Sequence, residues 1–191
     1  STRALKPRVA VLMAAVMNFV GALTFVGVAK AIANDIVDPM SLNAFEDDIT
    51  GSIVILASLL SAITWNLLTW YYGIPSSSSH TLIGSIAGAA IGAAGFAILN
   101  YEGFGKILIA LIVSPLLALS VGFIVMSLFK VLFKNLSLYK TNSRFRLLQI
   151  GTAAIQSFTH GTNDAQKAMG IITMALIAGG LQTTDEVQSW V

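Results

Sequence analysis

The sequence predicts an all-α membrane protein, a polytopic bundle of transmembrane helices. Hydrophobic residues make up 55% of the chain and charged residues only 10%, whereas a soluble domain carries about 25% charged residues. The mean hydropathy is +0.80. Cysteine is absent, which excludes disulfides and cysteine-based metal or redox sites from this segment.

Four apolar stretches account for the expected spans: residues 9–29, 53–72, 75–99 and 107–129. None of them contains Asp, Glu, Lys or Arg. Each approaches or exceeds the about 20 helical residues that cross a hydrocarbon core of roughly 30 Å. The first stretch is longer than the apolar core of a cleaved signal peptide, which has about 7 to 15 residues, and further spans follow it. We therefore expect all four stretches to be helices of the mature, multi-pass protein.

The charges predict an orientation. Eight of the eleven basic residues lie in the N-terminal flank, at Arg3, Lys6 and Arg8, or in residues 130–146, while the connection at 30–50 is acidic. By the positive-inside rule both basic segments are cytoplasmic, and four crossings between them agree with this. Residues 130–146 are expected to form a basic cytoplasmic loop. The net charge of +2 is too small to indicate a nucleic-acid partner.

Residues 71–95, "YYGIPSSSSHTLIGSIAGAAIGAAG", differ from a plain lipid-facing helix. One interpretation is a cytoplasmic turn with serine caps, followed by a close-packed helix. The other is that Pro75 starts a helix, or one arm of a re-entrant hairpin, whose N-terminus binds an anion within the membrane. Gly84, Gly88 and Gly92 recur every four residues, so we expect a stripe that a neighbouring backbone approaches closely.

A second unusual stretch covers residues 147–181, where "HGTNDAQK" interrupts an apolar sequence. About 35 residues are too many for one perpendicular span, so a broken helix or two half-helices is expected. Asp164 and Lys167 could form a structural pair at i, i+3 spacing. The alternative is a cation site, because Asn163 and Asp164 offer hard oxygen donors and Gly161 lets backbone carbonyls turn toward them.

Two motifs together resemble the inorganic phosphate transporter (PiT) family. "HGTNDAQKAMG" is similar to the family's repeated GAND signature, and "PSSSSHTLIG" is similar to its Pro-Ile/Val-Ser-x-Thr-His element. The stretch "STRALKPRVAVLMAAVMNFVGAL" resembles the segment that follows the first signature. The resemblance covers essentially the whole chain, and it implies a secondary active transporter of inorganic phosphate, coupled to sodium or protons and located in the cell membrane.

The resemblance also implies the fold and the site residues. The bundle would contain a re-entrant or broken-helix element in each of two inverted repeats, with the anion bound between the serine element and the Asn-Asp element. The implied substrate-binding residues are Ser76, Ser77, Ser78, Ser79, Thr81, Asn163, Asp164 and Gln166, with His80 and Lys167 beside them. The implied cation-binding residues are Asn163, Asp164 and Asn18, the last replacing a glutamate that is frequent in the family. The resemblance implies no catalytic residue, metal or cofactor.

By the same resemblance, the chain is a fragment. Residues 1–129 correspond to the transmembrane part of the first repeat, and residues 147–191 to the start of the second. The expected partners are inorganic phosphate, a monovalent cation and the lipid bilayer, and homo-oligomerisation stays open. Both repeats contribute to the site in this family, so transport would need the longer protein.

Other functions remain to be distinguished. Hydroxyls and helix-end N–H groups bind sulfate as well as phosphate, so a sulfate transporter of the same family is the alternative substrate class. Ser157, His160 and Asp164 lie at i, i+3 and i+7 on a helix, a spacing that an intramembrane serine hydrolase could use. A channel or a structural membrane subunit, in contrast, would bind no anion saturably.

Overall fold

The computed structural model describes residues 4–38, 41–42, 49–134, 138–184 and 186–188. The chain divides into two compact units. The first consists of Ser1–Phe25 and Leu108–Asp164, and the second of Val26–Ile107 and Ala165–Val191. Every regular element of the described residues is helical, apart from an isolated bridge between Val37 and Leu99.

The first unit contains helix α1 (Pro7–Thr24), most of helix α6 (Tyr101–Leu132) and the first part of helix α7 (Leu138–Ala178). Pro7 suits the first turn of α1, because the missing N–H would have no partner there. The helix ends where Phe25 turns to extended backbone. Consequently α1 stops five residues before the end of the predicted 9–29 span.

Helices α1 and α7 meet at glycines in this unit. A Cβ on Gly21 would collide with the carbonyl oxygen of Phe158, and one on Gly161 would collide with the backbone of Asn18. The Thr162 hydroxyl, which lies within hydrogen-bonding distance of the carbonyl of its own helix at Phe158, also lies 3.2 Å from the carbonyl of Gly21. Small residues that let two backbones touch are a common means of packing membrane helices.

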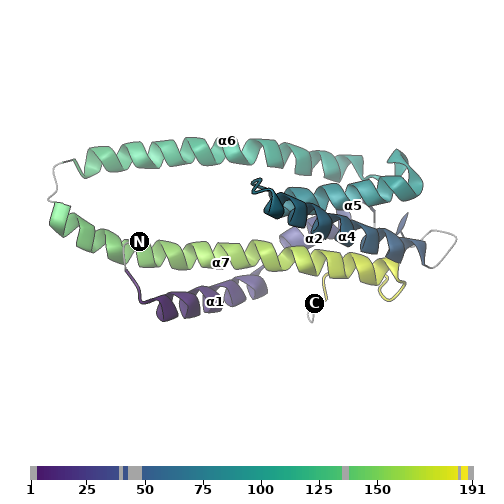
Figure 1. Cartoon of the computed structure of the whole chain (residues 1–191), viewed down its shortest axis with the longest axis horizontal. Helices are drawn as coiled ribbons and strands as arrows, with labels where there is room; N and C mark the ends of the chain where they lie inside the picture. Colours follow the sequence, from purple (N-terminus) through teal and green to yellow (C-terminus); the bar gives the residue numbers. More distant parts are fainter. Residues whose placement is uncertain (1–3, 39–40, 43–48, 135–137, 185, 189–191) are drawn as a thin grey trace. The chain divides into compact units, whose positions relative to one another are not determined.

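The second unit contains α2 (Gly27–Asn34), α4 (Thr50–Tyr71), α5 (Ser78–Ala94), the short 3-10 helix η1 (Phe96–Ile98) and the end of α7. Its core is made of fully buried apolar side chains, among them Ala29, Ile36, Leu42, Ile86, Met174 and Ile177. Gly170 of α7 lies against the backbone of Ala29 in α2, where a Cβ would be 2.7 Å from the carbonyl oxygen. Helices α4 and α5 run side by side (Figure 1).

Three of the described helices are long and apolar enough to cross a membrane: α1, α4 and α6. Helix α4 agrees closely with the predicted 53–72 stretch. Helix α5 covers only 17 residues of the predicted 75–99 stretch and is not among the three candidates. It begins at Ser78, so the expectation that Pro75 itself starts the helix is wrong. The predicted basic loop at 130–146 is mostly helical, because α6 continues to Leu132 and α7 begins at Leu138.

The expected break in residues 147–181 is absent, since α7 is one helix of 41 residues. The polar side chains of the motif explain why the helix continues. The side chains of Thr159, Thr162 and Asn163 each donate to the carbonyl four residues earlier, at 3.0 Å. Polar groups that bond back to their own helix need no unwound backbone.

The predicted glycine stripe is also corrected. A Cβ added at Gly84, Gly88 or Gly92 would meet nothing within 4 Å in the described part of the chain. Close backbone approaches are made instead by other glycines, among them Gly21, Gly161 and Gly170. The repeat of glycine at every fourth position showed that these residues lie on one face of a helix. It could not show which glycines contact another helix.

Candidate functional site

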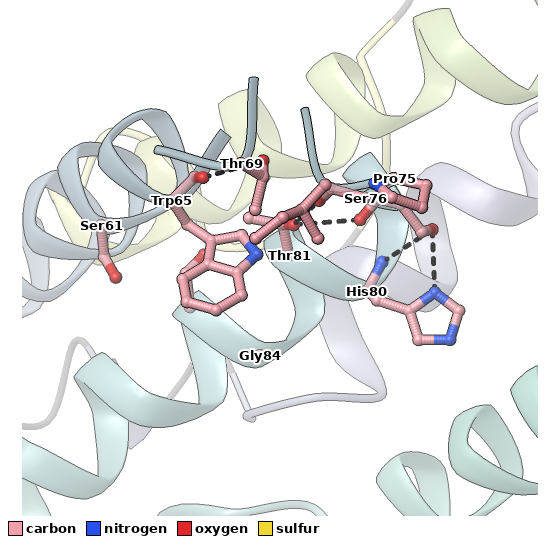
Figure 2. Close-up of a pocket in the computed structure, with 11 residues that line it drawn as sticks. Ser61, Trp65, Thr69, Pro75, Ser76, His80, Thr81 and Gly84 are labelled. Atoms are coloured by element: carbon pink, nitrogen blue, oxygen red, sulfur yellow. Dashed lines mark hydrogen bonds between the residues drawn. The ribbon is translucent and has the colours of Figure 1, made fainter. Parts of the chain in front are cut away.

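A cavity of about 640 Å³ lies where the serine element leads into α5, and its walls come from α4, the connection and α5. Figure 2 shows its lining, which consists of Ser61, Trp65, Thr69, Ile74, Pro75, Ser76, Ser77, His80, Thr81, Gly84 and Ser85. All of these residues belong to the second unit. The cavity is referred to below as the serine pocket.

Ser77 is the N-cap of α5. Its backbone is extended, with φ −99° and ψ 118°, and its hydroxyl accepts a long hydrogen bond of 3.4 Å from the His80 N–H. The same hydroxyl lies 2.8 Å from Nδ1 of the His80 ring. A serine at this position satisfies one of the free N–H groups at a helix start. The capping interpretation of the serine run is therefore confirmed for Ser77, and the capping hydroxyl lines the pocket.

Two further hydroxyls gather at the same place. The Ser76 and Thr81 oxygens lie 3.4 Å apart (Figure 2), and the Thr81 hydroxyl also donates to the Ser77 carbonyl at 3.0 Å. Ser78 and Ser79, which were also expected near the anion, are not among the lining residues. Of the serine element, the structure thus brings Ser76, Ser77 and Thr81 together.

A positive charge approaches the start of α5 from another helix. Lys167 of α7 donates from Nζ to the Ser78 hydroxyl at 3.3 Å. Ser78 is the first residue of α5, where the helix dipole and free N–H groups already favour negative charge. The sequence motif placed Lys167 beside the expected site but could not show this contact, because the two residues are 89 positions apart.

The pocket also contains residues that sequence reasoning missed. Ser61, Trp65 and Thr69 of α4 line it at intervals of four residues, and Ser85 continues the same interval from Ser77 and Thr81 on α5. A search for polar residues at i, i+4 and i+8 on the two adjacent helices would have found this set.

Gln166 has a different environment from the one expected. Its side chain is buried, and Oε1 accepts from the N–H groups of Val28 at 2.7 Å and Ala29 at 3.2 Å. These are free donors of the first turn of α2, so Gln166 acts as a cap supplied by a distant helix. It is not among the residues that line the serine pocket.

The Asn-Asp element belongs to the first unit. A groove of about 570 Å³ there is lined by Ala14, Asn18, Ala153, Gln156, Ser157, Thr159, His160 and Asn163. Asn18 of α1 and Asn163 of α7, both expected at a cation site, therefore face the same groove. Their side-chain amides donate to Ala14 and Thr159 carbonyls of their own helices, which leaves their side-chain oxygens to accept or coordinate.

Asp164 has a partner one helical turn earlier. Its Oδ2 lies 3.1 Å from Nε2 of His160, and both side chains are about half exposed or more. This contact is an ion pair when the imidazole is protonated. The sequence did not predict it, although i, i+4 spacing on a helix is the usual signal.

Three described helices that are long and apolar enough to cross a membrane define the class: a polytopic membrane protein. The sequence model of the phosphate transporter family matches residues 1–191, so the chain belongs to that family. The proteins of this family are transporters rather than enzymes, and the apolar helices of this chain fit a multi-pass protein of the cell membrane. The serine hydrolase alternative for Ser157, His160 and Asp164 is therefore rejected.

Several curated relatives are similar over nearly the whole chain. A probable low-affinity inorganic phosphate transporter of Bacillus subtilis is 65% identical over 192 residues, covering 100% of this chain and 56% of the relative. A protein with the same description from Mycobacterium leprae is 43% identical, covering 93% of this chain and 41% of the relative. The low-affinity inorganic phosphate transporter PitB of Escherichia coli is 34% identical, covering 92% of this chain and 40% of the relative. The chain thus spans about half the length of these relatives.

A solved structure has the same fold. It is described as the sodium-dependent phosphate transporter and matches with a TM-score of 0.79 and 21% sequence identity, covering 98% of this chain and 63% of that one. The match confirms the all-α membrane fold.

Proposed function

We propose that the longer protein of which this chain is part carries inorganic phosphate across the cell membrane together with sodium or protons. The observation that carries the proposal is the serine pocket at the start of α5. Family membership and the descriptions of the relatives, which name inorganic phosphate, support the substrate.

The pocket has the chemistry that a phosphate needs. Hydroxyls of Ser76, Ser77 and Thr81 converge on it, and hydroxyls donate to phosphate oxygens. The N-terminus of α5 adds free N–H groups and the positive end of a helix dipole.

Lys167 strengthens the argument for an anion. Its ammonium group contacts Ser78 at the start of α5, where two positive features come together. A cation at a helix N-terminus is unfavourable by about 0.3 to 1 kcal/mol, whereas an anion between the two stabilises both. We infer that phosphate binds at the start of α5, where it adds to the contacts that Lys167 already makes.

The coupling cation is assigned to the groove that Asn18 and Asn163 share, with Asp164 beside it on α7. Amide and carboxylate oxygens are suitable ligands for a small hard cation. The contact between His160 and Asp164 keeps a proton as the alternative coupling ion. Sodium and protons are therefore the two arms of the test.

The test is uptake by the full-length parent in proteoliposomes. Labelled phosphate should accumulate when a sodium or a proton gradient is imposed, and the gradient that drives it identifies the coupling ion. Labelled sulfate is the matched control for the anion. Uptake of sulfate but not phosphate would replace the substrate, and saturable uptake of neither anion would refute the proposal.

A further inference from the structure

A third hollow lies outside the proposed phosphate and cation sites. It is a groove of about 490 Å³ near the connection between α6 and α7, lined by Phe129, Asn142, Phe145, Arg146, Leu148, Gln149 and Thr152. All of these residues belong to the first unit. It is called the aromatic groove below.

Aromatic rings form one end of the groove. Phe129 of α6, Phe133 just beyond the end of α6 and Phe145 of α7 contact one another edge to face, with ring centroids 5.0 to 6.1 Å apart. Such pairs contribute about 0.5 to 1.5 kcal/mol beyond the area they bury. The cluster therefore holds the two helix ends together and gives the groove a rigid apolar wall.

The position of the groove in the sequence indicates its depth in the membrane. Phe129 is the last residue of the uncharged stretch 107–129, and Lys130 follows it directly. The groove thus begins where the hydrocarbon-compatible part of α6 ends. That boundary is where phospholipid headgroups meet their acyl chains.

The charge around the groove has one sign. No Asp or Glu occurs from residue 108 to residue 163, while the same stretch contains Lys130, Lys134, Lys140, Arg144 and Arg146. Arg146 lines the groove itself. A guanidinium group has five N–H donors and can bind a phosphate in addition to another partner.

We propose that the aromatic groove binds an anionic phospholipid. The lipid phosphate contacts Arg146, and the start of an acyl chain lies along Phe129 and Leu148. Basic pockets between membrane helices on the cytoplasmic side are suited to anionic headgroups. The volume falls within the about 300 to 1,000 Å³ of sites for small molecules, which is enough for a headgroup and the first part of a chain. The proposal does not depend on the transported substrate.

Native mass spectrometry of the full-length parent in detergent tests it. Phosphatidylglycerol should bind at lower concentration than phosphatidylcholine, which has the same chains and no net charge. Arg146→Gln should weaken phosphatidylglycerol binding about 10-fold, the size expected for loss of a hydrogen bond to a charged group. Arg8→Gln is the matched control: it removes one exposed arginine from α1 and should leave lipid binding as in the parent.

A second variant keeps the test decisive if Arg146→Gln lowers the folded yield. Gln149→Glu places a carboxylate on the groove wall and should weaken phosphatidylglycerol but not phosphatidylcholine. Equal binding of the two lipids, or parental binding by both variants, would overturn the proposal. Displacement of the lipid by inorganic phosphate at equal concentration would show a free-phosphate site instead.

Discussion

Four polar residues of the serine pocket, Ser76, Ser77, His80 and Thr81, already contact one another. The Ser77 hydroxyl contacts both the N–H and the ring of His80, and the Ser76 hydroxyl contacts Thr81. A phosphate in the pocket would exchange these contacts for stronger ones, because hydrogen bonds to a charged group are shorter and roughly twice as strong as neutral ones. Affinity at this site is thus a difference between two sets of hydrogen bonds.

Ser77→Ala tests whether the capping hydroxyl also binds the anion. Loss of a hydrogen bond to a charged ligand costs roughly 1.5 to 3 kcal/mol, or about 10- to 150-fold in affinity. We expect the apparent phosphate constant of the full-length parent to rise by at least the lower factor. Loss of the cap alone should cost about 1 kcal/mol of stability, which thermal unfolding in detergent would measure separately.

Ser79→Ala is the comparison for this prediction. Ser79 is one residue inside α5 and is not among the lining residues of the pocket. Its substitution should therefore change phosphate affinity less than Ser77→Ala. Equal losses in both variants would attribute the effect to the start of α5 as a whole, and no loss in either would place the anion elsewhere.

Substitution of Lys167 should affect thermal stability and phosphate affinity in different directions. In the absence of phosphate, Lys167→Gln removes a positive charge from the start of α5, so the thermal stability should stay the same or rise. Phosphate affinity should fall about 10-fold or more, as for loss of a charged hydrogen-bond partner. Equilibrium binding of labelled phosphate and thermal unfolding measure the two effects.

Two further variants separate charge from structure at this position. Lys167→Arg keeps the charge and should retain most of the affinity, whereas Lys30→Gln removes an exposed charge from α2 and should have no effect. If Lys167→Gln lowers the stability without phosphate and leaves the affinity unchanged, the lysine only anchors α7 to α5.

At the scale of the helices, sequence patterns predicted those helix boundaries that depend on a single segment of the chain. Helix α4 was predicted nearly to its ends because a mostly apolar segment of 22 residues without a charge has few alternatives in a membrane. Helix α7 was wrongly expected to break, because counting polar residues does not show that they bond to their own helix. The contacts of Gln166 with α2 join residues more than 130 positions apart and have no local signal.

The same distinction applies to the candidate site. The motif resemblance identified Ser76, Ser77 and Thr81, and the structure brings these together in the pocket. The sequence could not show the α4 wall of that pocket, because the wall depends on the packing of α4 against α5.

Gly161 in α7 provides a prediction about helix packing. A Cβ there would collide with the backbone of Asn18, so Gly161→Ala should push α1 and α7 apart and lower the thermal stability of the full-length parent. Gly151→Ala is the matched control on the same helix, because a Cβ at Gly151 meets nothing within 4 Å. It should be neutral, or stabilise by up to about 1 kcal/mol through helix propensity. Equal melting temperatures for the two variants would show that the α1–α7 contact contributes little.

At the scale of the whole molecule, the number of crossings decides the topology. Three helices qualify as spans by length and composition, and α5 with its 17 residues does not. If α5 is counted together with η1, the segment from Ser78 to Ile98 has about the 20 residues that a crossing needs. The alternative is a re-entrant arm that returns to the side from which it entered.

Cysteine labelling distinguishes these two topologies by parity. Ser41 precedes α4, and Ser137 lies in the connection between α6 and α7. Three crossings, by α4, α5 and α6, place the two positions on opposite sides of the membrane, as the acidic and basic connections predict. We therefore expect an impermeant maleimide to label Ser41→Cys from outside and Ser137→Cys only from the cytoplasmic side. Ala4→Cys, in the basic N-terminal flank, should behave like Ser137→Cys, because one more crossing by α1 separates it from Ser41. Labelling of Ser41→Cys and Ser137→Cys from the same side would mean that α5 does not cross, and its N-terminus with the serine pocket would then belong to a re-entrant arm.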